Sequence, residues 1–131
     1  MDYKYETTLI HSTRKTPEIE LNVEEGRIKI HGISIPENSK VFYDPLLNWV
    51  GDYLRNPKPE TTLIIALRYM NSSTTMIINK ILKALDQGIK TPNTLIFEWH
   101  YEEEDLEMYD VGQYYQELLQ TNVVFKEVEE I

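Results

Sequence analysis

The sequence predicts an α/β fold: a mixed β-sheet with an N-terminal antiparallel hairpin and parallel strands joined by three main helices. Two segments with alternating apolar residues lie close together, at residues 18–23 and 27–33. Beyond them, segments with helical spacing and segments with strand character follow one another in turn. Strands joined through a helix are normally parallel, with a right-handed crossover. The C-terminal part should therefore form a parallel layer, and the hairpin its antiparallel extension.

The hairpin is indicated by two strand-like segments and the short turn between them. Apolar and polar residues alternate over residues 18–23 and again over residues 27–33. The sequence Glu-Glu-Gly at residues 24–26 is short enough for a hairpin turn. Residues 1–15 lack a clear period, so we expect a loose arm, with at most a short strand over Tyr5–Ile10.

The first helix is predicted by apolar residues at helical intervals over residues 42–54. Asn38 or Ser39 is the expected N-cap. Pro45 leaves two arrangements open, because proline inside a helix clashes with the carbonyl four residues earlier. Either the helix kinks there, or a shorter helix starts at Asp44 with Pro45 at its first position.

The rest of the chain alternates between strands and helices. Residues 61–70 are too continuously apolar for an edge strand, so they predict a central strand covered on both faces. Residues 76–85 carry the apolar stripe of a helix that ends at Gly88. The remaining elements are a strand, a helix and a last strand, at residues 93–101, 102–120 and 122–128.

Composition limits the functional classes. With 22 acidic and 13 basic residues the formal net charge is -9, which disfavours nucleic acids and anionic membranes as partners. The excess of acidic residues either keeps the protein soluble or forms an acidic binding face. The chain has no cysteine and no leader-like start, and Leu63–Leu67 falls far short of the roughly 20 apolar residues of a membrane helix. We therefore expect one soluble cytoplasmic domain over residues 1–131.

Catalytic, metal and nucleotide sites are disfavoured by the spacing of the relevant residues. His11, His31 and His100 share no spacing that indicates a common site. The acidic run Glu102–Asp105 beside His100 is explained more simply by the positive end of a helix dipole than by a metal. The glycines are isolated, without the pattern of a phosphate-binding loop. We expect no cofactor.

Four consecutive hydroxyl side chains, Ser72–Thr75, stand between the central strand and the following helix. Asn71 or Ser72 can cap that helix, which stabilises it by about 1 kcal/mol. Capping needs only one residue. A phosphoryl group on a neighbour would face unpaired N–H groups and the positive end of the dipole, while adding about -1.5 to -2 charges. The residues themselves thus leave two interpretations of the hydroxyl cluster open, a helix cap alone or a cap beside a phosphorylation site.

Five segments together resemble the SiaC family of bacterial regulatory phosphoproteins. They occur in order from about Thr16 to the C-terminus, and "IPENS" combined with "NSST" is specific. The segments are "STRKTPEIEL", "GISIPENS", "FYDPLLNWVGDYL", "YMNSST" and "WHYEEEDLEM".

The resemblance implies a non-enzymatic signalling switch with a fold similar to the sulfate-transporter and anti-sigma-antagonist (STAS) domain. In this family a dedicated Ser/Thr kinase phosphorylates a hydroxyl in the junction motif, and a metal-dependent phosphatase removes the phosphate. The unmodified form binds a partner, which in characterised systems is a diguanylate cyclase that it activates. This implies a part in cyclic di-GMP signalling and biofilm regulation.

The family's acceptor directly follows the motif asparagine and is usually threonine. Carried over, the acceptor is Ser72, and because serine stands there, Ser73 is the alternative. Asn71, Ser73 and Thr74 would belong to the switch. Two rival functions are a constitutive acidic adaptor and a hydrolase or transferase that uses the hydroxyl cluster.

A second matched motif, Pro36-Glu37-Asn38, has two interpretations. It forms a loop beside the switch that contributes to partner binding, or it simply caps the first helix.

Overall fold

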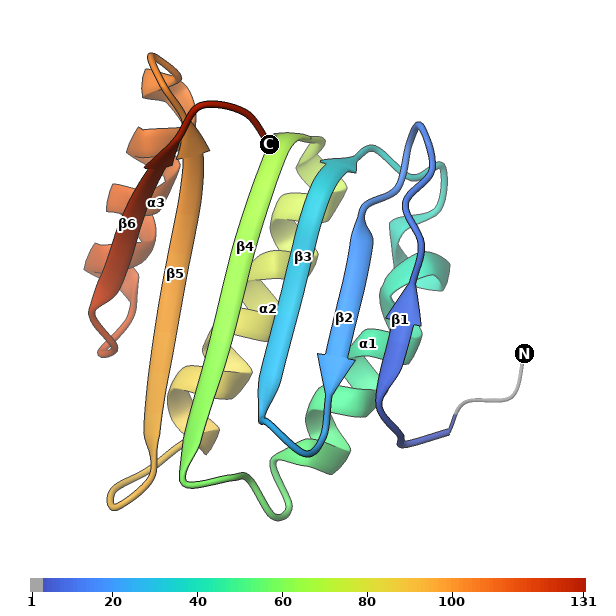
Figure 1. Ribbon diagram of the computed structural model, residues 1–131, viewed down its shortest axis with the longest axis vertical. Coiled ribbons are helices and arrows are strands. Elements are labelled where there is room, and N and C mark those ends of the chain that lie inside the picture. Colours follow the sequence, from blue (N-terminus) through green and yellow to red (C-terminus); the bar gives the residue numbers. More distant parts are fainter. Residues whose placement is uncertain (1–3) are drawn as a thin grey trace.

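The computed structural model describes residues 4–131, in which three helices cover one face of an open six-stranded sheet (Figure 1). The strands are β1 (Thr8–Ile10), β2 (Glu18–Asn22), β3 (Arg27–Ser34), β4 (Glu60–Met70), β5 (Thr94–Glu102) and β6 (Val123–Val128). The helices are α1 (Ser39–Tyr53), α2 (Ser72–Gly88) and α3 (Leu106–Leu118).

The strand order in the sheet follows the order along the chain, from β1 to β6. The pairs β1–β2 and β2–β3 are antiparallel, whereas β3, β4, β5 and β6 are parallel to one another. Each parallel connection passes through one helix. Because every crossover advances the sheet in the same direction with the same hand, all three helices lie on the same face (Figure 1). The predicted α/β class, with its hairpin and parallel layer, is confirmed.

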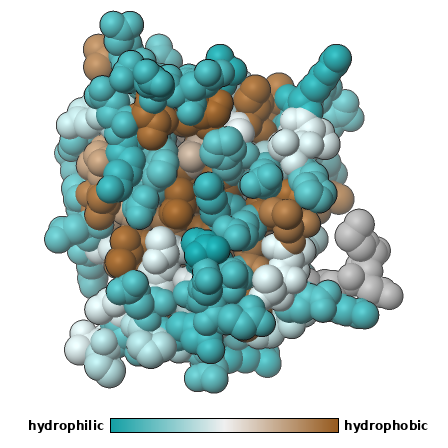
Figure 2. Space-filling view, viewed as in Figure 1, coloured by the Kyte–Doolittle hydropathy of each residue, from teal (hydrophilic) through white to brown (hydrophobic). Residues whose placement is uncertain are grey.

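The prediction that β4 is covered on both faces is wrong. Leu63, Ile65 and Leu67 point toward the helices and are fully buried. Ile64 lies on the face without helices, in register with Lys29 of β3 and Glu98 of β5, and is half-buried. Long charged side chains can shield an apolar neighbour with their aliphatic stems, so an apolar run need not mean a second helical layer. Figure 2 shows hydrophilic and hydrophobic side chains intermixed on this open face.

The N-terminal segment is tied to the sheet and to α1. The short strand expected near its end is present as β1, paired with β2. The indole N–H of Trp49 donates to the Glu6 carbonyl at 3.0 Å, and the Tyr5 ring packs on the same indole. A three-residue edge strand is too short to show a period, so the sequence predicted a loose arm here. The first three residues of that predicted arm lie outside the described residues.

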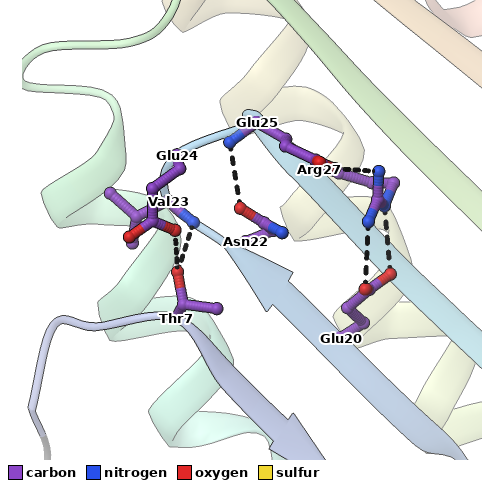
Figure 3. A network of polar contacts seen from close by, with 7 residues as sticks. All are labelled: Thr7, Glu20, Asn22, Val23, Glu24, Glu25 and Arg27. Atoms are coloured by element: carbon purple, nitrogen blue, oxygen red, sulfur yellow. Dashed lines mark hydrogen bonds and ion pairs between the residues drawn. The ribbon is translucent and has the colours of Figure 1, made fainter.

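The turn between β2 and β3 is held by a polar network (Figure 3). Asn22 accepts a hydrogen bond from the Glu25 N–H at 2.9 Å, and Arg27 pairs with Glu20 at 3.0 and 3.1 Å. Thr7 accepts from the Val23 N–H at 3.0 Å, which connects the N-terminal segment to the turn. These contacts stabilise the predicted hairpin.

Helix α1 begins at Ser39, with Asn38 as its N-cap. The Asn38 side chain accepts a hydrogen bond from the Val41 N–H at 3.1 Å. Pro45 lies inside the helix, so the alternative helix that starts at Asp44 is wrong. The cap fixes the first turn well before the proline, and proline removes only one backbone donor.

Within residues 4–131, no helix has the length and apolar character needed to cross a membrane.

Helix α3 begins later than predicted, at Leu106 with Asp105 as N-cap. Glu102 still belongs to β5, and a turn with Glu104 in the left-handed region (φ 66°) separates the two elements. Of the acidic run, Asp105 caps the helix with its side chain, which accepts from the Met108 N–H at 3.1 Å. Glu104 contacts the first helical residue only through its carbonyl, which accepts from the Leu106 N–H at 3.0 Å. Trp99 of β5 is fully buried.

The far end of α2 is joined to the loop after α3 by Asp86. Its carboxylate accepts from the Gln120 and Thr121 N–H groups at 3.0 and 2.9 Å and from the Thr121 hydroxyl at 2.7 Å. Burial alone would raise the pKa of Asp86, but these hydrogen bonds hold it below the usual 3.8. The carboxylate form therefore stabilises the fold.

Replacing Asp86 by Ala should lower the free energy of unfolding by about 1–3 kcal/mol at neutral pH, because partly buried donors lose their acceptor. The folded-state pKa is lowered, so the contribution is complete above the unfolded-state pKa and is lost as pH falls through the folded-state value. Urea unfolding should therefore give a difference between wild type and Asp86→Ala that shrinks between about pH 5 and pH 2. Asp110→Ala, at an exposed site, is the control. A pH-independent difference would contradict this role.

Candidate functional site

The three helices begin at one edge of the sheet, where the parallel strands end (Figure 1). This follows from the topology, because each parallel strand runs to that edge and passes directly into a helix or the loop before it. The hydroxyl cluster Ser72–Thr75 lies at the junction of β4 and α2, on this edge. The loop between β3 and α1 reaches the same place.

Asn71 is the N-cap of α2, which settles the choice between Asn71 and Ser72. The Asn71 side-chain oxygen accepts from the Thr74 N–H at 3.0 Å and from the Ser73 hydroxyl at 3.0 Å. Ser72 is thus the first residue of the helix, and its side chain is exposed. The Ser72 hydroxyl makes no hydrogen bond with any residue that the structure describes.

Thr74 belongs to a buried chain of hydroxyl groups that links three elements. Its hydroxyl donates to the Ser34 carbonyl at 3.1 Å and contacts the Ser34 hydroxyl at 2.8 Å. The Ser34 hydroxyl in turn lies 2.6 Å from the phenol oxygen of Tyr43. Because Thr74 donates to the carbonyl, it accepts from Ser34, which accepts from Tyr43. Thr74 is fully buried and its hydroxyl has a structural role.

Tyr43 is a neutral donor in this chain. Burial raises the pKa of Tyr43 to about 12, although the hydrogen bonds with Ser34 and Thr74 act to lower it. The phenol therefore keeps its proton at neutral pH and can donate to Ser34. The end of β3, the start of α1 and the start of α2 are held together through these groups.

Ser73 and Thr75 are also engaged. The Ser73 hydroxyl lies 2.6 Å from that of Ser39, which joins the starts of α1 and α2. Thr75 is half-buried and donates to the Asn71 carbonyl at 3.3 Å. Of the four predicted hydroxyls, Ser72 is thus the exposed one without a partner among the described residues.

The predicted motif Pro36-Glu37-Asn38 lies beside the junction. Pro36 is buried, and Glu37 is exposed and 3.4 Å from the Lys15 ammonium. The next residue, Ser39, contacts Ser73. The motif therefore caps α1 and also forms a loop next to the hydroxyl cluster, so its two proposed roles are compatible.

Large apolar side chains are exposed around the same edge. They are Val41, Tyr69, Met76 and Leu106, each between 59% and 71% exposed, and we refer to them as the apolar rim. They lie at the end of β4 and in the early turns of the three helices. Such a group of exposed apolar side chains is typical of an interaction surface. Helical periodicity alone does not show where an apolar stripe emerges from the core, so the exposure of Met76 and Leu106 could not be read from the sequence.

None of the three histidines lies in the β4–α2 junction that carries Ser72. His31 and His100 lie on the open face of the sheet, with His100 2.9 Å from Glu98. His11 lies between β1 and β2. Among the described residues, no group of three or more His, Asp or Glu side chains is arranged to hold a metal ion.

Comparison with known proteins gives consistent matches. The family model for SiaC family regulatory phosphoproteins matches residues 10–128. An uncharacterized protein of Pseudomonas aeruginosa (strain UCBPP-PA14) is 26% identical over 108 residues, covering 82% of this chain and 86% of that protein.

Solved structures match the fold. A chain in the crystal structure of the diguanylate cyclase SiaD in complex with its activator SiaC, from P. aeruginosa, superposes with a TM-score of 0.86 at 23% identity, over 92% of this chain and 99% of that chain. Apo-SiaC from the same organism superposes with a TM-score of 0.80 at 21% identity, over 92% and 98% of the two chains. The family match spans nearly the whole chain, and this protein therefore belongs to the SiaC family of regulatory phosphoproteins.

Proposed function

We propose that this protein is a non-enzymatic switch, phosphorylated reversibly on Ser72, whose unphosphorylated form binds and regulates a diguanylate cyclase. The observation that carries the proposal is the position of Ser72 at the first residue of α2, where its side chain is exposed and its hydroxyl makes no hydrogen bond with a described residue. The crystal structure of SiaD with its activator SiaC supports the choice of partner.

A phosphoryl group on Ser72 is compatible with the folded state. The N-cap bond from Asn71 to the Thr74 N–H does not involve Ser72 and can persist. The phosphate would lie at the positive end of the α2 dipole, near backbone N–H groups that lack helical acceptors. Phosphorylation therefore changes the charge of the surface without requiring a different fold.

Release of the partner follows from where that charge is placed. Ser72 lies on the edge that carries the apolar rim, and a phosphoserine adds about -1.5 to -2 charges there. A partner that buries the apolar rim would have to desolvate this charge, which is costly without a compensating cation. The unphosphorylated form should thus bind and the phosphorylated form should not.

The other residues of the junction would support the switch without accepting phosphate. Asn71, Ser73 and Thr74 fix the position of the acceptor. The exposed residues Glu37 and Asn38 extend the partner surface on the side of α1, and the buried Pro36 shapes the loop that carries them. The exposure of Ser72 leaves it accessible to a Ser/Thr kinase and to a metal-dependent phosphatase. A cytoplasmic location and action without a cofactor belong to the same proposal.

The test is the affinity of this protein for a diguanylate cyclase of the same organism, before and after phosphorylation by the cognate kinase. We expect phosphorylation to weaken binding by about tenfold or more, equivalent to at least about 1.4 kcal/mol. Isothermal titration calorimetry measures both affinities. Equal affinities would indicate a constitutive adaptor, and loss of the phosphate without a phosphatase would favour an enzyme that uses the hydroxyl cluster.

A further inference from the structure

A pocket of about 270 Å³ opens on the same edge, between the end of β4 and the starts of α2 and α3. Its origin is the separation of β4 from β5, which pair only as far as Ala66 and His100. The residues at the end of β4 then line the pocket instead of pairing with β5. Thr75 of α2 lines the pocket from the side of the hydroxyl cluster.

A register shift shapes this end of β4. Gly32 pairs with Leu67, but the next residue, Ile33, pairs with Tyr69, so that Arg68 is an extra residue in β4. Such a bulge changes the direction of the side chains that follow it. The bulge leaves Tyr69 exposed as part of the apolar rim, and Arg68 lines the pocket.

The lining combines apolar walls with two carboxylates. Met70, Met108 and Val111 supply apolar surface, and Asp105 and Glu107 supply the carboxylates. One oxygen of Asp105 caps α3, whereas the other makes no hydrogen bond with a described residue. Glu107 is exposed and has no ion-pair partner in the described part of the chain.

The charge of the pocket is negative. Arg68 also lines it, but its guanidinium lies 3.7 Å from the Glu102 carboxylate, which offsets its charge. Within residues 4–131, the carboxylates of Asp105 and Glu107 then have no ion-pair partner. A purely apolar side chain would leave them unmatched, and an anion would be repelled, so the complementary occupant has a long apolar stem and a cationic head.

We propose that this pocket receives an arginine side chain of the partner protein that docks on the apolar rim. The inference rests on the proposed function, because it assumes a partner on this edge. The stem would pack on Met70, Met108 and Val111, and the guanidinium would pair with Asp105 and Glu107. Arginine is favoured at interfaces because its planar head binds carboxylates with two parallel hydrogen bonds.

The pocket and the phosphorylation site have separable effects. A phosphate on Ser72 adds negative charge near the pocket, so it does not oppose the binding of an isolated arginine. Release of the whole partner is instead caused by the cost of burying the phosphate against the apolar rim. An isolated arginine ligand should therefore bind the pocket in both forms of the protein.

The test is an NMR titration of the full chain, labelled at Met and Val methyl groups, with N-acetyl-arginine amide. The neutral analogue N-acetyl-citrulline amide has nearly the same shape. We expect saturable shifts at Met70, Met108 and Val111 with the arginine probe, and at least about tenfold weaker binding of the citrulline probe. Equal binding of both probes, or no shifts with either, would overturn the proposal.

A variant and its control complete the test. The double variant Asp105→Asn, Glu107→Gln should reduce binding of the arginine probe by about tenfold or more, while the amide oxygen introduced in place of the Asp105 carboxylate can still cap α3. Glu117→Gln, at an exposed site elsewhere on α3, should leave binding unchanged. Unchanged binding in the double variant would contradict the pocket assignment. Because the probe needs no cyclase, this result is independent of the calorimetric test of phosphorylation.

Discussion

The Ser72→Ala protein should acquire no phosphate on residues 71–75 when it is incubated with the cognate kinase and ATP, whereas the wild-type protein should be phosphorylated on Ser72. The reason is that the four hydroxyls differ in burial and in hydrogen bonding, and only Ser72 is both exposed and without a side-chain hydrogen bond to a described residue. Thr74 is fully buried, and Ser73 and Thr75 are held in hydrogen bonds. Tandem mass spectrometry of the junction peptide identifies the modified residue.

Ser73→Ala is the matched control, because it removes the neighbouring hydroxyl and leaves Ser72 in place. It should be phosphorylated to a similar extent as wild type, although it loses the contact with Ser39. Phosphate on Ser73 of the wild-type protein, retained in Ser72→Ala, would shift the acceptor by one residue. No phosphate anywhere on residues 72–75 would refute the switch.

Gly112→Ala should destabilise the fold strongly for so small a change. A Cβ at this position would lie 2.6 Å from both the Phe125 and the Trp99 rings. Trp99 cannot easily move, because it is fully buried and its indole N–H donates to the Met108 carbonyl at 2.8 Å. Overpacking of this kind costs about 1–3 kcal/mol of unfolding free energy.

Gly51→Ala is the control in another helix. A Cβ there meets no atom within 4 Å, so only the intrinsic preference for alanine acts. That preference should stabilise the protein by about 0.5–1 kcal/mol. Urea unfolding should thus shift in opposite directions for the two glycine variants. A shift in the same direction would contradict the tight packing of α3 on β5 and β6.

Much of the fold could be predicted because the signals are local. Alternation defines β2 and β3, and the N-cap asparagines mark the starts of α1 and α2. The bulge at Arg68 depends on pairing between strands that are far apart in the chain, and no local pattern shows it. The sequence also did not show that no helix covers the face of the sheet that carries Ile64. Which face each helix covers is set by the order of all the strands in the sheet.

The candidate site was only partly predictable for the same reason. The four hydroxyls were evident in the sequence, but their different roles depend on Ser34 and Ser39, each more than thirty residues away. Nothing local distinguishes Thr74 from Ser72. The apolar rim likewise consists of single residues from four elements, so it exists only once these elements share an edge.

Because Asn71 rather than Ser72 caps α2, the proposed acceptor Ser72 is not needed for the integrity of the fold. The two phosphorylation states should then have similar stability and similar susceptibility to proteolysis. The lifetime of the protein in the cell would be the same in both states. The proportion of active protein would be determined by the balance of kinase and phosphatase activity, not by selective degradation of one form, so a signal could be reversed without new synthesis.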